Sequence, residues 1–314
     1  MALCIRLRDA SGFGFFSETF RIAHAALVAE FHSIPLVIDS SKWLFKIQNG
    51  WRDWFSSYAE VTPGQDILDY DIFLHQDSQQ MQGFQVKDYR AILPKIFQYT
   101  PELLEEVKRV QESLGLTKPY CGMFIRLGDK LVKESVKLPI DIYAKKVLEK
   151  FPDCQTVFLQ TDDIRVVSEL QNWYTANGHS IRVVSTCPKD KFGAFVFWFQ
   201  PELGTEIASR GDPTRPHQPN EEYFETYQAL PPQKTVCSYT TQEMEAHVKE
   251  MLIGLELCRR AKGVVLDYTS NTSRYLALSH PGGFESVWNI DTWIKIHDEC
   301  WMHPPYIYPF LIDE

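Results

Sequence analysis

The sequence has few cysteines, and none of them is spaced to bind a metal or to act in redox chemistry. Its 314 residues include seven cysteines, and no two of them form the Cys-x-x-Cys spacing of a zinc ribbon or a thioredoxin-like motif. Their odd number and wide scatter favour reduced, mostly buried thiols over a disulfide framework. These residues are Cys4, Cys121, Cys154, Cys187, Cys237, Cys258 and Cys300.

The chain also lacks an excess of positive charge and a long apolar run. Its 32 Lys and Arg against 41 Asp and Glu give a net charge of −9, which argues against the clustered cations of a nucleic-acid surface. No stretch reaches the roughly 18 apolar residues of a membrane-spanning helix. Arg6 and Arg8 interrupt the first apolar stretch before it could serve as a signal peptide. We expect no nucleic-acid partner, no membrane span, and a cytoplasmic protein or a soluble domain excised from a longer one.

The length and the order of the predicted elements indicate two domains. At roughly 150 residues per domain, the chain is long enough for two cores. In the first third, strands near residues 3–7 and 35–39 enclose a predicted helix, Ser17–Phe31, with Ser17 as its N-cap. An amphipathic helix near 101–116 closes this region. We therefore predict an N-terminal α/β domain over residues 1–115.

The second region alternates more regularly between short apolar runs and helices. The apolar runs cover residues 120–125, 156–160, 181–185 and 263–267, and helical segments separate most of them. This alternation predicts a parallel, doubly wound sheet, in which ligands bind at the carboxyl ends of the strands. We predict a Rossmann-like domain over 116–285, with a Pro-rich irregular insert at about 186–239 and a C-terminal tail over 286–314.

Arg126 ends a strand that is otherwise apolar, and further charged residues follow it closely. Lys130 and Glu134 are four positions apart and could simply pair on a helix face, while Arg126 could be solvated or paired with a nearby acid. In the functional interpretation, Arg126 and Lys130 face a phosphate at the carboxyl edge of the sheet. Glu134 is then available as a general base.

Two acids, Asp162 and Asp163, follow the next predicted strand directly. One of them could cap the helix that begins near Ile164, or the pair could bind a ribose or a sugar. A double acid could also indicate a metal ion. Because no second cluster of carboxylates or histidines stands at ligand spacing, we expect no metal.

The segment "DYTSNTSR", Asp267 to Arg274, follows the last predicted strand and opens a helix. Its hydroxyl and amide side chains could do no more than cap that helix. The backbone N–H groups of the first turn and the helix dipole also form an anion site. Because this turn and Arg126 end strands of the same predicted sheet, we expect them to lie at the same edge.

Two further patterns in the first third are weaker signals. Gly12 and Gly14 form a Gly-x-Gly turn that lacks the third glycine of a dinucleotide-binding site. Trp43, Trp51 and Trp54 could line a sugar-stacking surface or belong to the core.

Four segments resemble, in the same order, the α-1,6-fucosyltransferases that modify N-glycan cores and rhizobial nodulation factors, within the wider superfamily of GDP-fucose-using enzymes. This resemblance implies the GT-B fold, in which two Rossmann-like α/β domains face each other across a cleft. The N-terminal domain is then on the acceptor side and the C-terminal one binds the donor nucleotide. The four segments are "GFGFFSETFRIAHAALVAEFHSIPLVIDSSKW" followed by "GW", "GMFIRLGDKLVKE", "VFLQTDD" and "RRAKGVVLDYTSNTSRYLAL".

The resemblance implies roles for individual residues. Arg126 matches the arginine that binds the donor diphosphate, and Lys130 and Glu134 match the family's lysine and its catalytic glutamate. Ser270 matches a hydroxyl that contacts the diphosphate. The residues implied in donor binding are Arg126, Phe124, Asp162, Asp163, Ser270, Asn271, Thr272, Gly12 and Gly14.

The sequence departs from the family pattern at three positions. Phe124 stands where the family has a histidine that helps to place the guanosine, and Leu127 stands where it has a second arginine. The acid that contacts guanine falls at Gly254, with Glu250 and Glu256 nearby. Phosphate binding is therefore better supported by the residues than the identity of the base.

The resemblance implies an inverting, metal-independent glycosyltransferase that moves L-fucose from GDP-fucose to a hydroxyl of a glycan acceptor. Its partners are a sugar-nucleotide donor and a glycan, and no cofactor is needed besides the donor. Two alternatives stay open. The same fold could use GDP-rhamnose, GDP-mannose or a UDP-sugar, or the chain could be a catalytically silent module that binds glycans or nucleotides.

Overall fold

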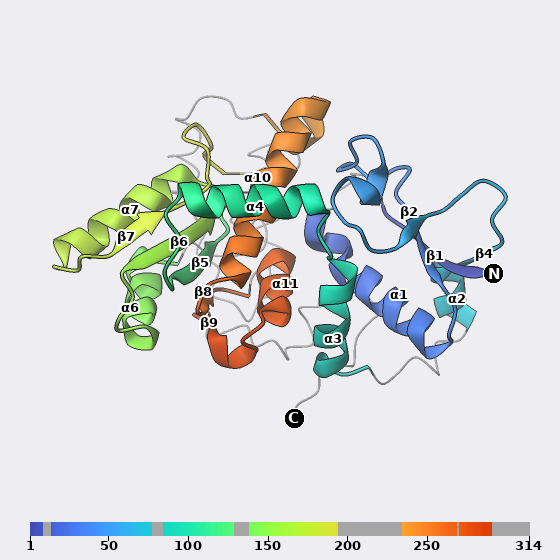
Figure 1. The fold of residues 1–314 in the computed structure, drawn as a ribbon, viewed down its shortest axis with the longest axis horizontal. Helices are drawn as coiled ribbons and strands as arrows, with labels where there is room; N and C mark the ends of the chain where they lie inside the picture. The colour runs from blue at the N-terminus through green and yellow to red at the C-terminus, as the bar shows by residue number, and fades with distance from the viewer. Residues whose placement is uncertain (9–13, 77–83, 129–137, 194–233, 269, 291–314) are drawn as a thin grey trace, which may run out of the picture. The chain divides into compact units, whose positions relative to one another are not determined.

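The computed structural model describes residues 1–8, 14–76, 84–128, 138–193, 234–268 and 270–290. These residues form two compact units, each with its own parallel β-sheet (Figure 1). Unit 1 holds the described residues of 1–106 and 277–279, and unit 2 holds those of 107–276 and 280–290. The division falls inside helix α4, whereas the predicted domain boundary at residue 115 follows that helix. The predicted α/β class with parallel strands is confirmed.

Unit 1 is built on a four-stranded sheet in the order β3-β2-β1-β4, and each pair of neighbours is parallel. Its first two strands are almost wholly buried, as expected for a parallel sheet. The strands are β1 (Ala2–Arg6), β2 (Leu36–Asp39), β3 (Ala59–Glu60) and β4 (Ile67–Asp69). The helices are η1 (Phe15–Glu18), α1 (Thr19–Phe31), η2 (Gly50–Asp53), α2 (Tyr70–Gln76), α3 (Val86–Ile96) and α4 (Pro101–Ser113), the last of which continues into unit 2.

Ser17 does not cap the helix of the first unit, so that prediction is wrong. A short 3-10 turn precedes α1, which begins at Thr19 with Glu18 at the N-cap. The Ser17 hydroxyl instead donates a hydrogen bond to the Gly14 carbonyl oxygen at 2.5 Å. The side chain that looked like a cap therefore closes the turn before the helix.

The tryptophans of unit 1 belong to its core. Trp43, Trp51 and Trp54 are at most 4% exposed, and the rings of Trp51 and Phe55 lie 4.3 Å apart between centroids. The indole N–H groups of Trp51 and Trp54 donate to the carbonyl oxygens of Ser57 and Phe45, at 3.1 and 2.9 Å. These buried rings form no sugar-stacking surface, which removes the feature on which the silent binding module depended.

Unit 2 is built on a five-stranded parallel sheet in the order β7-β6-β5-β8-β9. The fifth strand was not predicted: it lies in the segment assigned to the C-terminal tail, and pairs with β8. The strands are β5 (Cys121–Ile125), β6 (Thr156–Thr161), β7 (Arg182–Val184), β8 (Val264–Leu266) and β9 (Val287–Asn289). The helices are α6 (Ile140–Lys150), α7 (Ile164–Ala176), η3 (Val236–Ser238), α10 (Thr241–Arg259), α11 (Asn271–Ser279), whose last residues belong to unit 1, and η4 (Phe284–Ser286).

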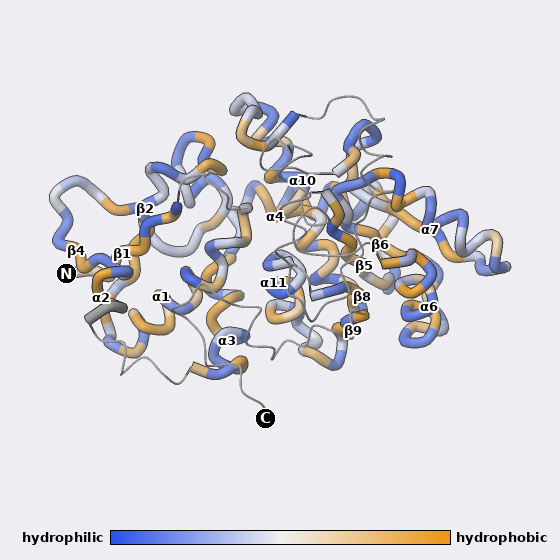
Figure 2. Tube along the Cα trace, turned by 180° about the vertical axis from the view of Figure 1, so that it is seen from behind, coloured by the Kyte–Doolittle hydropathy of each residue, from blue (hydrophilic) through white to orange (hydrophobic). Residues whose placement is uncertain are grey.

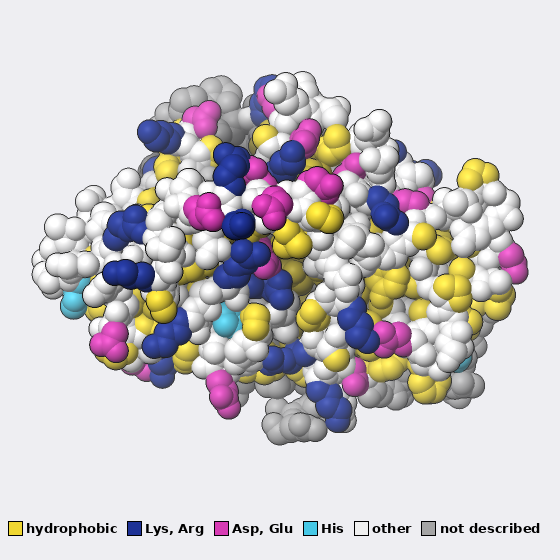
Figure 3. Space-filling model, viewed as in Figure 1, with side chains coloured by type: hydrophobic (Ala, Val, Ile, Leu, Met, Phe, Trp, Pro, Cys, Tyr) yellow, Lys and Arg dark blue, Asp and Glu magenta, His cyan; other side chains and the backbone are white. Residues whose placement is uncertain are grey.

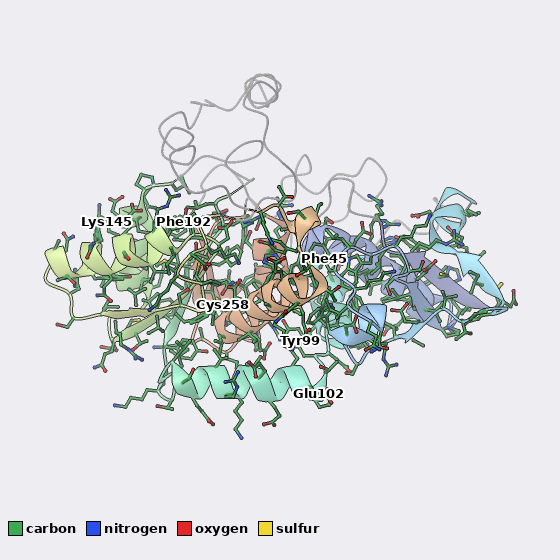
Figure 4. All side chains as sticks on the ribbon, turned by 90° about the horizontal axis from the view of Figure 1, so that it is seen from above. Phe45, Tyr99, Glu102, Lys145, Phe192 and Cys258 are labelled. Atoms are coloured by element: carbon green, nitrogen blue, oxygen red, sulfur yellow. The ribbon has the colours of Figure 1, made fainter. Side chains whose placement is uncertain are left out.

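Helices cover both faces of this sheet, which is why its central strands are apolar without alternation (Figures 1 and 2). On one face, Met123 and Ile125 of β5 belong to a core cluster with Val147 of α6 and Leu170 of α7. On the other face α10 packs against β5 and β6. Cys258 of α10, labelled in Figure 4, is fully buried, and its thiol donates to the Met123 carbonyl oxygen at 3.8 Å.

Candidate functional site

Three strands of unit 2 end at the same edge of its sheet, and polar residues follow each of them. In the parallel register Ile125 of β5 lies opposite Thr161 of β6, and Met123 lies opposite Val265 of β8. Arg126, Asp162 and Asp267 therefore all follow the carboxyl ends of adjacent strands. This juxtaposition was predicted from the sequence, and it is where ligands bind in open α/β sheets.

Arg126 and Asp162 form an ion pair across the ends of β5 and β6. The guanidinium donates to Asp162 Oδ2, and the backbone N–H of Leu127 donates to Oδ1 at 2.8 Å. The Asp162 side chain is 7% exposed and that of Arg126 is 18% exposed. The carboxylate thus fixes the direction of a cation that keeps some contact with solvent at the sheet edge.

Asp163 plays a different part from its neighbour. Its carboxylate accepts from the backbone N–H of Arg165 at 3.0 Å as the N-cap of α7. The Arg165 guanidinium binds the same carboxylate, with Nη2 2.5 Å from Oδ2. The capping interpretation is confirmed for Asp163, and a role of either acid in donor binding stays a prediction.

The N-terminus of α11 lies at the same edge, after β8. Ser270 is its N-cap: the Ser270 hydroxyl accepts from the Ser273 N–H at 3.1 Å, and Ser273 Oγ accepts from the Ser270 N–H at 3.2 Å. The backbone N–H groups of Asn271 and Thr272 donate to no acceptor among the described residues. Two amides of the first turn, together with the helix dipole, are therefore available to an anion.

Arg274 and Asp267 hold the turn between β8 and α11 in place, and the sequence analysis assigned neither a role. Arg274 is 2% exposed and donates twice to the Tyr268 carbonyl oxygen, at 3.0 and 2.9 Å. Asp267 is 4% exposed and accepts from the Tyr143 hydroxyl at 2.8 Å. These contacts fix the turn that leads from β8 into α11. Both residues therefore influence the site through the position of the first turn of α11.

A polar group on the α10 side of β6 was also missed by the sequence analysis. Glu250 accepts from Lys191 Nζ at 2.5 Å and from Gln160 Nε2 at 3.0 Å. His247, one turn before Glu250 on α10, is half-buried, and burial together with the cations Lys191 and Arg126 lowers its pKa to about 3. The spacing of His247 and Glu250, one turn apart on a predicted helix, could have indicated this polar group. The partner of Glu250, Lys191, could not be inferred, because it lies in a charged loop far away in the sequence.

The positions at which the sequence departs from the fucosyltransferase pattern are packed into the core. Phe124 and Leu127 are each 4% exposed. A Cβ atom at Gly254 would lie 1.7 Å from Gln160 Oε1, so the position tolerates no side chain while Gln160 stays in place. Glu256 is paired with Arg259 and Arg260. The acid nearest to Gly254 that faces Gln160 is thus Glu250.

Several predicted site residues lie outside the described residues. These are Gly12, Lys130 and Glu134, and their roles stay predictions. Gly14 is described, and its carbonyl accepts hydrogen bonds from both the hydroxyl and the backbone N–H of Ser17.

Metal-ligand clusters and membrane-spanning helices are both absent from the part of the chain that the structure describes. Within it, no group of three or more His, Cys, Asp and Glu side chains is placed to hold a metal ion. Also within it, no helix has the length and apolar character needed to cross a bilayer. On the face shown in Figure 3, acidic and basic side chains are interspersed.

The chain matches no protein-family profile and no curated protein sequence. Among solved structures it is similar to NodZ α-1,6-fucosyltransferase soaked with GDP-fucose, with 14% identity over 89% of this chain and 93% of that one, at a TM-score of 0.49. Fucosyltransferase NodZ from Bradyrhizobium matches with 13% identity over 88% and 93%, at 0.46. A variant of Arabidopsis thaliana FUT1 in complex with GDP matches with 9% identity over 88% and 68%, at 0.45.

The matched structures are fucosyltransferases, the class of enzyme that the four sequence segments indicate.

Proposed function

We propose that this protein is an inverting glycosyltransferase that moves L-fucose from GDP-fucose to a hydroxyl of a glycan acceptor without a metal ion. The observation that carries the proposal is the convergence of Arg126, Asp162 and the Ser270-capped start of α11 at one edge of the unit 2 sheet. The sequence resemblance assigns Arg126 and Ser270 to the donor diphosphate and Asp162 to donor binding, and the three residues come from separate segments.

The charges at this edge suit a departing diphosphate. Arg126 is a permanent cation, held in place by Asp162, and the amides of Asn271 and Thr272 add fixed dipoles. Preorganised donors of this kind stabilise negative charge as it develops on a leaving group, and they need no reorganisation during the reaction. We propose that they supply the electrostatic help for which other transferases use a divalent cation.

The reaction needs one base and one leaving group. The acceptor oxygen attacks C1 of the fucose from the face opposite the diphosphate, the bond between C1 and the phosphate oxygen breaks, and GDP departs with that electron pair. Glu134 takes the proton of the acceptor hydroxyl, a role that rests on the sequence resemblance. Inversion at C1 follows from this single displacement.

Release of nucleoside diphosphate from a panel of sugar nucleotides tests the proposal. We expect release from GDP-fucose in the presence of glycan acceptors, and a loss of at least about tenfold in Arg126→Ala, because a charge-assisted phosphate contact is removed. Glu134→Gln should retain donor binding and lose transfer. Arg260→Ala, which removes an exposed arginine paired with Glu256, is the matched control and should keep its rate. Turnover of Arg126→Ala close to that of the unmodified protein would contradict the assignment.

A second candidate is the same reaction with another sugar nucleotide. Phe124 and Leu127 are core residues, and a side chain at Gly254 would displace Gln160, so the guanine contacts implied by the resemblance are not reproduced at these positions. Faster release of diphosphate from GDP-mannose, GDP-rhamnose or a UDP-sugar than from GDP-fucose would favour this alternative.

A further inference from the structure

A polar hollow of about 710 Å³ lies in unit 1, and its described lining residues include none of those assigned to the donor. It is at the carboxyl ends of β2 and β3, where Ile38 lies opposite Glu60 in the parallel register. Asp39 and Ser40 follow one strand, while Glu60 and Val61 end the other, and all four line the hollow. Its volume is within the range of about 300–1,000 Å³ that small-ligand sites occupy.

The wall of the hollow, residues 46–53, is held by carboxylates. Asp53 accepts hydrogen bonds from the backbone N–H groups of Ile47, Gln48 and Asn49, at 2.7, 3.0 and 2.8 Å. Because one side chain satisfies three successive amides, this part of the loop has a defined conformation.

A second carboxylate ties the end of this wall to the sheet. Glu60 accepts from Ser40 Oγ at 2.5 Å and from the Trp51 N–H at 2.6 Å. Gly50 lies between them at φ +66°, and a Cβ there would be 1.8 Å from Ser40 Oγ, so only glycine fits. The buried ring of Trp51 anchors the same turn in the core.

Three polar side chains on this wall are exposed and could form hydrogen bonds with a ligand. Gln48, Asn49 and Arg52 are exposed, and among the described residues their side chains make no hydrogen bond or ion pair. The backbone of this wall is already ordered, so binding of a ligand costs mainly the rotamer freedom of these side chains.

The charges around the hollow cancel. The lining includes two acids, Asp39 and Glu60, and two cations, Lys46 and Arg52, and Val61 is the one apolar side chain among the described lining residues. Burial raises the pKa of Asp39, but hydrogen bonds from Ser41 and the charges of Arg6 and Lys42 lower it overall, so this carboxylate is ionised at neutral pH. Carboxylates, amides and a guanidinium together suit a ligand whose hydroxyl groups both donate and accept hydrogen bonds.

We propose that this hollow binds a neutral saccharide unit of the acceptor glycan, with Asn49 and Arg52 as its principal hydrogen-bonding side chains. The assignment to an acceptor rests on the proposed function. The binding of a neutral saccharide rests only on the geometry and charge of the hollow.

Titration with neutral disaccharides, without any donor, tests the proposal. The probes are maltose, cellobiose, lactose and N,N′-diacetylchitobiose, followed by calorimetry or by ligand-observed NMR. We expect at least one to bind, and Asn49→Ala and Arg52→Ala each to weaken that binding by about tenfold, as for loss of a hydrogen bond to a charged or amide group. Both side chains are exposed, so the variants should fold, which thermal unfolding checks. The matched controls are Asn177→Ala and Arg260→Ala in unit 2, which should bind normally.

The outcomes separate this proposal from the donor assignment. Binding that is lost in Asn49→Ala and Arg52→Ala supports the hollow even if no sugar nucleotide is turned over. Absence of binding by all four disaccharides, or binding that both variants retain, overturns it, even if GDP is released from GDP-fucose. Preferential binding of inorganic phosphate, weakened by Arg52→Ala, would also overturn it.

Discussion

Arg126 and Asp162 are charged residues that follow buried strands, and each gives the other a partner. Each residue follows a buried strand, and the parallel register places the two side by side. A buried carboxylate without a partner would be costly, as would an arginine without one. The pair therefore keeps both charges at the edge of the sheet, where we propose that the donor diphosphate binds.

His247 is the residue whose protonation should couple folding to pH. Its pKa of about 3 in the folded protein is below the value of about 6.5 expected in the unfolded chain. Between these values the unfolded state binds more protons, so the free energy of unfolding falls as the pH is lowered from about 6.5 toward 3.

We expect the protein to lose about 1–2 kcal/mol of stability between neutral pH and about pH 5 through this group. His247→Gln should remove that part of the pH dependence, as measured by urea unfolding at both pH values. An identical pH dependence in the variant and the unmodified protein would show that His247 does not titrate in this way.

At the scale of elements, two helices of unit 2 begin with the same kind of cap but in different places. In α10 the Thr240 hydroxyl accepts from the Glu243 N–H at 3.3 Å, while Glu243 accepts from the Thr240 N–H at 2.8 Å. In α11, Ser270 and Ser273 form the corresponding box. The cap of α11 follows directly after β8, which pairs with β5, the strand that Arg126 follows, so we expect this cap to affect a bound anion.

This difference gives a prediction with an internal control. Ser270→Ala and Thr240→Ala should each lower the free energy of unfolding by about 1 kcal/mol, the usual cost of losing a cap. Ser270→Ala should also weaken GDP binding by several-fold, whereas Thr240→Ala should not change it. Calorimetric titration with GDP measures the affinities. Equal GDP affinities in the two variants would count against α11 as the diphosphate site.

At the scale of the whole molecule, each unit has its own sheet and its own candidate ligand edge. The residues proposed to bind the donor lie at the carboxyl ends of β5, β6 and β8, and the polar hollow lies at those of β2 and β3. A ligand that binds only the folded state protects the amides of the unit that it contacts.

Hydrogen exchange should therefore separate the two sites. GDP at about 100 times its dissociation constant should slow exchange by up to about 100-fold in amides of 121–127 and 270–276. A bound disaccharide should instead protect amides of 47–61. Protection of 47–61 by GDP alone, with 121–127 unchanged, would reverse the assignment of ligands to units.

Much of the fold was predictable because the relevant interactions are local. The alternation of apolar runs and amphipathic helices identified four of the five strands of the second sheet, and the residues after β5, β6 and β8 were placed at one edge. Short strands with mixed burial were not found: β3 has only two residues, and β9 follows a turn within the presumed tail. Such strands are recognised only through the neighbours with which they pair.

The sequence by itself determined the α/β class, the carboxyl-edge position of Arg126 and the start of α11, and the resemblance to fucosyltransferases. Only the tertiary structure decided that Asp162 holds Arg126 while Asp163 caps a helix, that the tryptophans are buried, and that Glu250, Lys191 and Gln160 meet. The reason is that periodicity and strand order follow from neighbouring residues, whereas the choice of partner among adjacent acids depends on contacts between segments far apart in the chain. The polar hollow of unit 1 likewise depends on the register of β2 and β3 and on Gly50, where Ser40 and Glu60 occupy the space that a side chain would need.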